Sequence, residues 1–258
     1  LFAKPTIINN VETLANIPWI IAHGAQAYRT FGTTKSPGTR LVSVSGHVTR
    51  PGVYEVEHGY PVGRFIHEDC GGVLGGRALK AVIPGGISTK VLTASEIEPH
   101  RLGHFGDCED RRVLPQSAGI PHLEPLVFEG ESLQAAGSSL GSGGMIVIAE
   151  GTCMVRVLQV MLRFYHHESC GQCTPCREGM GWLHRIVDRI VSGRGRPEDV
   201  DRLYEISRAN DGTTICGLGD AAGYATVGIL DKFRCEFEYF IAHGRSRYDG
   251  CLECLGSS

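Results

Sequence analysis

The spacing of hydrophobic residues changes about halfway along this chain. Residues 41–48 and 53–57 have strand composition and enclose the turn Thr49-Arg50-Pro51-Gly52, which predicts a hairpin. We expect three further elements after it: a helix from Pro61 to about Cys70, a strand from Ala78 to Ile83 and a short strand at 90–93. A hairpin, a helix and returning strands in this order predict a small β-grasp-like domain.

From Cys153 onward the hydrophobic residues instead recur every three or four positions, as in amphipathic helices. We expect four helices with short connections: from 155 to the histidines at 166 and 167, at 175–192, from 197 onward and at 220–243. The residues expected on their buried faces are Val155, Leu158, Leu162, Tyr165, Trp182, Leu183, Ile186, Val187, Ile190, Val200, Leu203, Ile206, Val227, Leu230, Phe233, Phe237 and Phe240. The predicted fold class is therefore α+β, with a β-grasp domain followed by a C-terminal four-helix bundle.

A further amphipathic helix is predicted near the N-terminus, starting after Asn9 and Asn10 and ending near Gly24. Asn10 is a favourable N-cap, because its side-chain oxygen can accept hydrogen bonds from the first turn. The two asparagines have a second interpretation, since exposed amides before a helix N-terminus can also meet a ligand phosphate or ring. Spacing alone favours capping.

Two segments without hydrophobic periodicity interrupt the predicted elements. Residues 98–122 are rich in His, Arg and Pro and carry Cys108, which indicates an irregular inserted loop. Residues 137–144 form a Gly/Ser loop between a short helix at 132–136 and a buried strand at 145–148. No Gly-Lys-Ser/Thr follows this loop, so it is not a P-loop, and we expect close backbone packing instead.

Composition narrows the class of protein. The chain has 258 residues, of which 42% are hydrophobic and 21% charged, as in globular proteins. The formal net charge of -3 and the lack of Lys or Arg runs argue against nucleic acid as a partner. The longest apolar stretches are shorter than the roughly 20 residues that span a bilayer, so no membrane span is expected. The first residues, Leu1 to Pro5, lack an initiator Met and suggest a fragment of a longer protein.

The chain has ten cysteines, and the candidate metal ligands are among them. Cys170, Cys173 and Cys176 have the C-x2-C-x2-C spacing of thiolate ligands, which favours a metal site in a reducing compartment over a disulfide framework. A fourth ligand is needed. The position that a two-cluster ferredoxin would use is Met180, whereas Cys216 lies in a glycine-flanked loop between the third and fourth helices.

The remaining cysteines are weaker candidates for the fourth ligand. Cys70 is expected to be a buried apolar residue. Cys235 lies within the predicted fourth helix, where a structural role needs no metal, and Cys251 and Cys254 lie on a short tail. Four thiolates with one remote member suit a [4Fe-4S] cluster better than zinc, which more often takes two separate C-x2-C pairs. Zinc remains the alternative.

Two other motifs have plainer explanations. Residues 217–222 satisfy a loose G-x-G-x-x-A pattern, but they lie between predicted helices and follow no strand, which argues against dinucleotide binding. His166 and His167 are expected to be solvated residues at a helix end rather than ligands.

Four motifs together resemble one protein family. They are Lys4-Pro5-Thr6 with Asn9-Asn10-Val11-Glu12-Thr13, then Leu140-Gly141-Ser142-Gly143-Gly144, then Glu168-Ser169-Cys170-Gly171 with Cys173, Pro175-Cys176-Arg177 and Gly179, and finally Cys216 with Leu218-Gly219-Asp220. This set resembles the flavin subunit of bacterial NADH-quinone oxidoreductase, the respiratory complex I. The same subunit type recurs in NAD-reducing hydrogenases and NAD-dependent formate dehydrogenases.

The resemblance covers only the C-terminal part of that subunit. It implies three parts: residues 1–38 as the tail of an FMN-binding domain, 39–130 as a β-grasp soluble-ligand-binding domain and 131–258 as the iron–sulfur helical bundle. The family's glycine-rich loop for FMN and NADH is missing, and so no catalytic residue is assigned. The long 98–122 loop and the terminal Cys251 and Cys254 pair depart from the family.

The resemblance also implies roles for individual residues. Cys170, Cys173, Cys176 and Cys216 would ligate a [4Fe-4S] cluster, Asn9 and Asn10 would contact FMN, and Leu218 would lie near the flavin. Hydride transfer from NADH to FMN would be followed by one-electron passage through the cluster to neighbouring subunits.

The partners implied are other subunits of a redox complex, notably a thioredoxin-like [2Fe-2S] subunit and a larger iron–sulfur subunit. The implied location is cytoplasmic and peripheral to the inner membrane. Two other hypotheses stay open: a non-catalytic scaffold stabilised by zinc, and a split subunit whose FMN domain is a separate chain.

Overall fold

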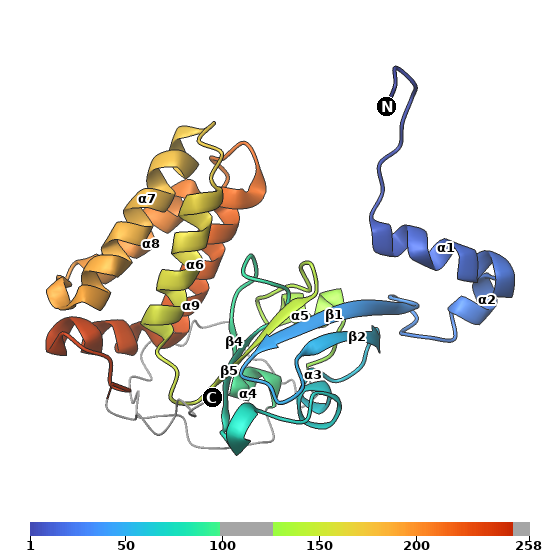
Figure 1. The fold of residues 1–258 in the computed structure, drawn as a ribbon, viewed down its shortest axis with the longest axis horizontal. Helices are drawn as coiled ribbons and strands as arrows, with labels where there is room; N and C mark the ends of the chain where they lie inside the picture. The colour runs from blue at the N-terminus through green and yellow to red at the C-terminus, as the bar shows by residue number, and fades with distance from the viewer. Residues whose placement is uncertain (99–125, 250–258) are drawn as a thin grey trace.

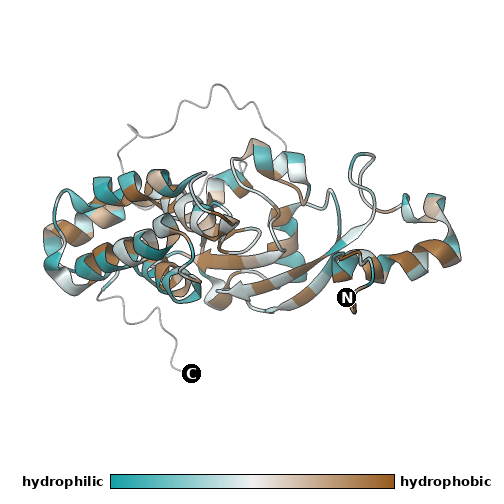
Figure 2. Cartoon of the chain, turned by 90° about the horizontal axis from the view of Figure 1, so that it is seen from above, coloured by the Kyte–Doolittle hydropathy of each residue, from teal (hydrophilic) through white to brown (hydrophobic). Residues whose placement is uncertain are grey.

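The computed structural model of the chain describes residues 1–98 and 126–249 and has a mixed α/β architecture (Figure 1). A five-stranded sheet lies in the middle, with the N-terminal helices α1 and α2 on one side and helices α6 to α9 on the other (Figures 1 and 2). The main elements are α1 (Val11–His23), α2 (Ala25–Tyr28), β1 (Thr39–Gly46), β2 (Gly52–Glu57), α3 (Val62–Arg64), β3 (Leu79–Ile83), β4 (Leu92–Thr93), α4 (Ala94–Ile97), α5 (Gly130–Ala135), β5 (Gly144–Ala149), α6 (Met154–Glu168), α7 (Thr174–Arg189), α8 (Asp199–Asn210) and α9 (Gly217–His243). Short π-helical turns extend α3 over Phe65–Asp69 and α7 over Ile190–Arg194, and a 3-10 turn covers Leu74–Gly76.

The sheet has the strand order β2-β1-β5-β3-β4. β1 and β2 form the predicted antiparallel hairpin, in a register that pairs Thr39 with Glu57 and Val44 with Gly52. β5 runs parallel to β1 and antiparallel to β3, so it is the central strand. The sheet therefore includes residues on both sides of the division expected at residue 130. A short apolar strand needs hydrogen-bonding partners on both edges when it is buried, and β1 and β3 supply them.

The Gly/Ser loop that precedes β5 packs closely against the turn after β3. A Cβ atom on Gly85 would lie 2.4 Å from the carbonyl carbon and oxygen of Leu140, and one on Gly141 would lie 2.1 Å from the Gly85 oxygen. The backbones can approach this closely only because neither residue has a side chain. The structure thus confirms close backbone packing for this loop.

Helices α6 to α9 share one hydrophobic core. The predicted inward residues of α6 are all buried, as are Leu203, Phe237 and Phe240 on α8 and α9. Trp182 is different, because it is 49% exposed and the prediction that it faces inward is wrong. The buried stripe of α7 passes through Met180 and Leu183, and Trp182 lies about 100° around the helix from Leu183.

The N-terminal helix buries none of its residues. Two of its hydrophobic residues, Leu14 and Ile17, are 49% and 41% exposed. Brown, hydrophobic segments are visible along the N-terminal helices at the right of Figure 2. Among the helices that the structure describes, none combines the length and hydrophobicity needed to cross a bilayer. The inserted loop expected at 98–122 and the Cys251 and Cys254 tail lie outside the described residues, apart from Glu98.

A candidate iron–sulfur site at three helix ends

The three clustered cysteines lie on the connection between α6 and α7. Cys170 follows the end of α6, Cys173 is the N-cap of α7, and Cys176 lies in the first turn of α7. Cys216 is the N-cap of α9, which begins at Gly217 rather than near Asp220 as predicted. The remote cysteine is therefore attached directly to a helix start rather than set back within a loop.

The glycines around Cys216 explain why the predicted start of α9, near Asp220, is later than the observed start at Gly217. Glycine is a poor helix former, so the sequence around Gly217 and Gly219 favours a loop. In the fold, Gly219 is buried, and a Cβ there would lie 2.5 Å from the Cγ2 atom of Thr214. Close packing between the loop and the first turn of α9 therefore outweighs the low helix propensity.

The structure brings the four candidate ligands together. Burial is the main cause that raises the pKa of the Cys176 thiol, and the Cys173, Cys216 and Cys170 sulfurs raise this pKa further. The Ser169 hydroxyl, 3.1 Å from the Cys176 sulfur, opposes these effects. All four cysteines have free thiols. Within the described residues, no three His, Cys, Asp or Glu side chains converge tightly enough for a single metal ion.

Two helix N-termini meet at these thiols. Each carries a partial positive charge and unpaired backbone N–H groups, which stabilise thiolates and favour anionic groups nearby. Cys173 and Cys216, as N-caps of α7 and α9, lie closest to these charges. Four thiols in this setting fit a [4Fe-4S] cluster, in which each thiolate binds a different iron.

Hydrogen bonds from Arg177 hold the loop between Cys170 and Cys173. Its guanidinium donates to the Gly171 carbonyl at 2.9 Å and to the Thr174 hydroxyl at 3.3 Å. Gly171 has a φ of +76°, a left-handed conformation that favours glycine. Arg177 and Gly171 belong to the sequence motif, but residue spacing alone does not reveal the hydrogen bond between them.

A second set of hydrogen bonds holds the loop that carries Cys216. The Thr214 hydroxyl lies 2.7 Å from the Cys216 carbonyl oxygen and 2.9 Å from the Asp220 carboxylate. The same carboxylate oxygen accepts a hydrogen bond from the Gly212 N–H at 3.2 Å. Leu218 lies on the first turn of α9, partly buried against the helical core. Its predicted proximity to a flavin stays a prediction.

The two histidines beside the motif are exposed residues in the last turn of α6, as expected. The His166 ring stacks on the ring of His184 from α7, with 5.8 Å between the ring centroids. Cys70, also as expected, is fully buried, and burial raises its pKa to about 11.

Asn9 and Asn10 directly precede α1, and α1 lies on the opposite side of the sheet from helices α6 to α9 (Figure 1). The structure confirms capping, because Asn10 Oδ1 accepts hydrogen bonds from the N–H groups of Glu12 and Thr13 at 2.8 and 3.3 Å. Asn9 Oδ1 in turn accepts from the Asn10 N–H at 2.8 Å. The asparagines and the cysteines are therefore two separate candidate sites within this chain.

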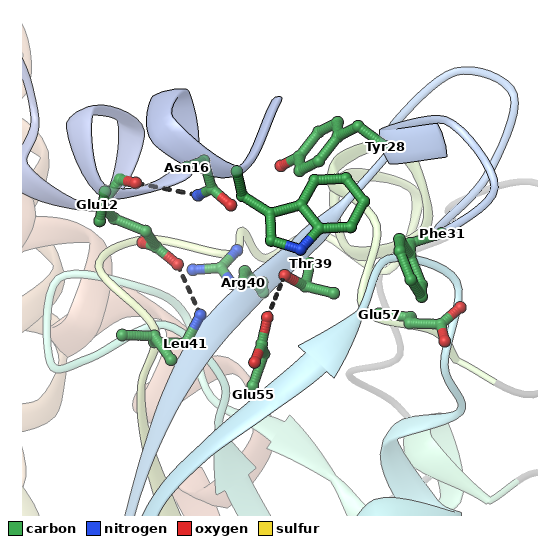
Figure 3. Close-up of a pocket in the computed structure, with 11 residues that line it drawn as sticks. Glu12, Asn16, Tyr28, Phe31, Thr39, Arg40, Leu41, Glu55 and Glu57 are labelled. Atoms are coloured by element: carbon green, nitrogen blue, oxygen red, sulfur yellow. Dashed lines mark hydrogen bonds between the residues drawn. The ribbon is translucent and has the colours of Figure 1, made fainter. Parts of the chain in front are cut away.

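A cavity of about 590 Å³ lies between α1 and the β1–β2 hairpin (Figure 3). The Glu12 carboxylate crosses one end of it and accepts a hydrogen bond from the Leu41 N–H at 2.6 Å. Trp19 and the Arg40 guanidinium also line the cavity, and burial lowers the pKa of Arg40. The Glu12 contact ties the N-terminal helix to the sheet.

Comparisons with known proteins point to one family. The family described as "NADH-ubiquinone oxidoreductase-F iron-sulfur binding region" matches residues 156–240, and the SLBB domain family matches residues 40–113. The F 2 subunit of the Rhizobium meliloti NADH-quinone oxidoreductase is 40% identical over 247 residues, which are 96% of this chain and 52% of that protein. The corresponding F subunit of the Mycobacterium tuberculosis enzyme is 40% identical over 96% of this chain and 50% of its own length.

Two further comparisons agree. The mitochondrial NADH dehydrogenase [ubiquinone] flavoprotein 1 of Dictyostelium discoideum is 41% identical over 92% of this chain and 44% of its own length. A crystal structure of an NAD+-reducing [NiFe]-hydrogenase in the H2-reduced state superposes with a TM-score of 0.73 and 28% identity, over 92% of this chain and 35% of that one. This chain spans about half the length of the curated relatives that it matches. We conclude that the chain is homologous to part of the NADH-quinone oxidoreductase F subunits and of the mitochondrial NADH dehydrogenase flavoprotein 1.

Proposed function

We propose that this chain is the electron-transfer part of an NADH dehydrogenase flavin subunit. It would pass electrons from FMN, reduced by NADH, through a [4Fe-4S] cluster to neighbouring subunits. The observation that carries the proposal is the convergence of Cys170, Cys173, Cys176 and Cys216 at three helix ends. The iron–sulfur family match, residues 156–240, contains all four.

In this proposal the four cysteine sulfurs hold the cluster, and α6 to α9 form the four-helix bundle around it. A bound [4Fe-4S] cluster accepts and releases one electron at a time. The chain contributes the surroundings: Cys176 is buried, two helix N-termini face the thiolates, and Arg177 braces the loop. The sheet would serve as the β-grasp domain that connects the bundle to the flavin side.

A zinc-stabilised scaffold is the competing function for the same four thiols. Anaerobic purification of the chain, followed by iron, sulfide and zinc analysis and an absorbance spectrum, separates the two. We expect about four irons and four sulfides per chain and a brown colour. A colourless protein with one zinc and no iron would refute the cluster.

We further propose that Asn9 and Asn10 contact FMN. The Oδ1 atom of Asn10 accepts from the cap of α1, so a flavin contact by this residue would use its Nδ2 amide. Asn10→Asp keeps the capping oxygen and removes the amide donor, whereas Asn10→Ala removes both. In the assembled flavoprotein, lower FMN content in both variants supports the contact. Normal FMN content in Asn10→Asp opposes it.

The parent complex has two candidates, an NADH-quinone oxidoreductase and an NAD-linked hydrogenase or formate dehydrogenase. The structural likeness to an NAD+-reducing hydrogenase supports the second, and the closer sequence identity to F subunits supports the first. Native isolation with a tag on this chain, followed by mass spectrometry, would identify the associated subunits. We expect a thioredoxin-like [2Fe-2S] subunit, a larger iron–sulfur subunit and a cytoplasmic location at the inner membrane. Recovery of hydrogenase or formate dehydrogenase subunits instead would assign the other complex.

A further inference from the structure

Cys176 differs from the other three candidate ligands in its burial. The residue is 4% exposed, whereas Cys173 is partly buried and Cys170 and Cys216 are exposed. Water can donate hydrogen bonds to the sulfurs of exposed cysteines. The Cys176 sulfur is shielded, so its hydrogen bonds have to come from the protein.

Ser169 supplies such a contact, since its Oγ atom lies 3.1 Å from the Cys176 Sγ atom. A cysteine that binds iron is a thiolate and has no hydrogen to donate. The hydrogen in this contact therefore belongs to the Ser169 hydroxyl, which donates to the sulfur.

The loop orients this hydroxyl. The Gly171 N–H lies 3.4 Å from Ser169 Oγ and donates to it, which occupies a lone pair of the oxygen. The Gly171 carbonyl is held in turn by Arg177 at 2.9 Å. With its oxygen engaged on one side, Ser169 presents its hydrogen to Cys176.

We propose that Ser169 donates a hydrogen bond to the Cys176 thiolate and thereby raises the reduction potential of the cluster, an inference that rests on the proposed function. Reduction of a bound cluster would add one electron, and part of the added negative charge would reach the Cys176 sulfur. A donor at a sulfur stabilises this reduced form more than the oxidised form, and the effect is larger where water is excluded. No bond is formed or broken, and Ser169 keeps its proton.

The test compares midpoint potentials of the full chain by redox titration under anaerobic conditions, monitored by electron paramagnetic resonance. Ser169→Ala removes the hydroxyl, and Ser169→Thr keeps it. Ser192→Ala is the matched control, because the Ser192 hydroxyl donates to the Asp188 carbonyl at 2.8 Å, in the π-helical turn at the far end of α7. Iron and sulfide are measured in every sample.

We expect Ser169→Ala to shift the midpoint to a more negative potential with an unchanged iron content, and Ser169→Thr and Ser192→Ala to match the wild type. An unchanged midpoint in Ser169→Ala would overturn the inference while leaving the cluster intact. A wild-type chain without iron would instead refute the proposed function.

If Ser169→Ala fails to retain iron, Ser169→Val replaces it, because valine has the shape of threonine without its hydroxyl. A lower midpoint in Ser169→Val than in Ser169→Thr supports the inference. Loss of iron from both hydroxyl-free variants would overturn it, since Ser169 would then be required for cluster assembly rather than for tuning.

Discussion

Lys80 Nζ lies 2.5 Å from Glu236 Oε1, and both side chains are 4% exposed. Lys80 is on β3 and Glu236 on α9, so this buried ion pair joins the sheet to the helices. Lys80 also donates to the Thr152 carbonyl at 2.6 Å and the Tyr248 hydroxyl at 3.0 Å, while the second Glu236 oxygen accepts from the Met154 N–H at 2.8 Å. The pair is therefore fully hydrogen-bonded at the junction between the two halves of the fold.

Removing one partner should destabilise the chain strongly. Glu236→Ala leaves the Lys80 ammonium buried without its carboxylate. We expect this to lower the free energy of unfolding, measured in urea, by about 3–5 kcal/mol. Glu238→Ala is the control on the same helix, because Glu238 pairs with Arg234 but is 55% exposed, and its loss should cost about 1 kcal/mol or less. Similar losses from the two variants would show that the buried pair adds nothing beyond a surface pair.

The contact between Gly85 and Leu140 makes a steric prediction. In Gly85→Ala the new Cβ would lie 2.4 Å from the Leu140 carbonyl, so the two loops must separate, at a cost of about 1–3 kcal/mol. Gly130→Ala places a Cβ where no atom lies within 4 Å, and it should leave stability nearly unchanged. Thermal unfolding of the two variants checks this. A melting temperature of Gly85→Ala equal to that of the wild type would mean that the loops do not pack as described.

His47 should make stability depend on pH. Burial, and then the nearby Arg77 charge, lower the pKa of His47 below its usual 6.5. The unfolded chain therefore binds this proton more readily than the folded chain, and stability is lost as pH falls below about 6.5. Urea unfolding at pH 7.5 and pH 5 should show this loss. His47→Gln should reduce it, and an identical pH dependence in that variant would exclude His47 as a cause.

Two N-cap cysteines give a matched test of the fourth ligand. Cys216 caps α9 near the three clustered thiols, whereas Cys153 caps α6 and is buried at its start. We expect Cys216→Ala to lose most of its bound iron and sulfide, and Cys153→Ala to retain them. Both replacements remove an N-cap thiol, so the comparison isolates ligation from helix capping. Full iron content in Cys216→Ala would remove this residue from the ligand set.

Local patterns in the sequence determined a large part of this structure. The hairpin, the N-cap at Asn10 and the four C-terminal helices follow from periodicity and turn chemistry, which act between residues a few positions apart. The C-x2-C-x2-C spacing identified a thiol cluster for the same reason. The glycine-rich flanks of Cys216 pointed to a remote cysteine that the fold places near Cys176.

Only the tertiary structure decided how distant segments meet. It placed β5 between β1 and β3, started α9 at Gly217 and turned Trp182 outward. It also set Ser169 beside the Cys176 sulfur. The physical reason is that each of these features depends on contacts that local sequence patterns do not determine. The neighbours of β5, the contact of Gly219 with Thr214 and the face of α7 that the core covers are set only when the fold is assembled. The sequence by itself thus determined the local elements and the thiol motif. The packing of sheet and helices decided that Cys176 is the buried thiol of that motif and that the Ser169 hydroxyl contacts it.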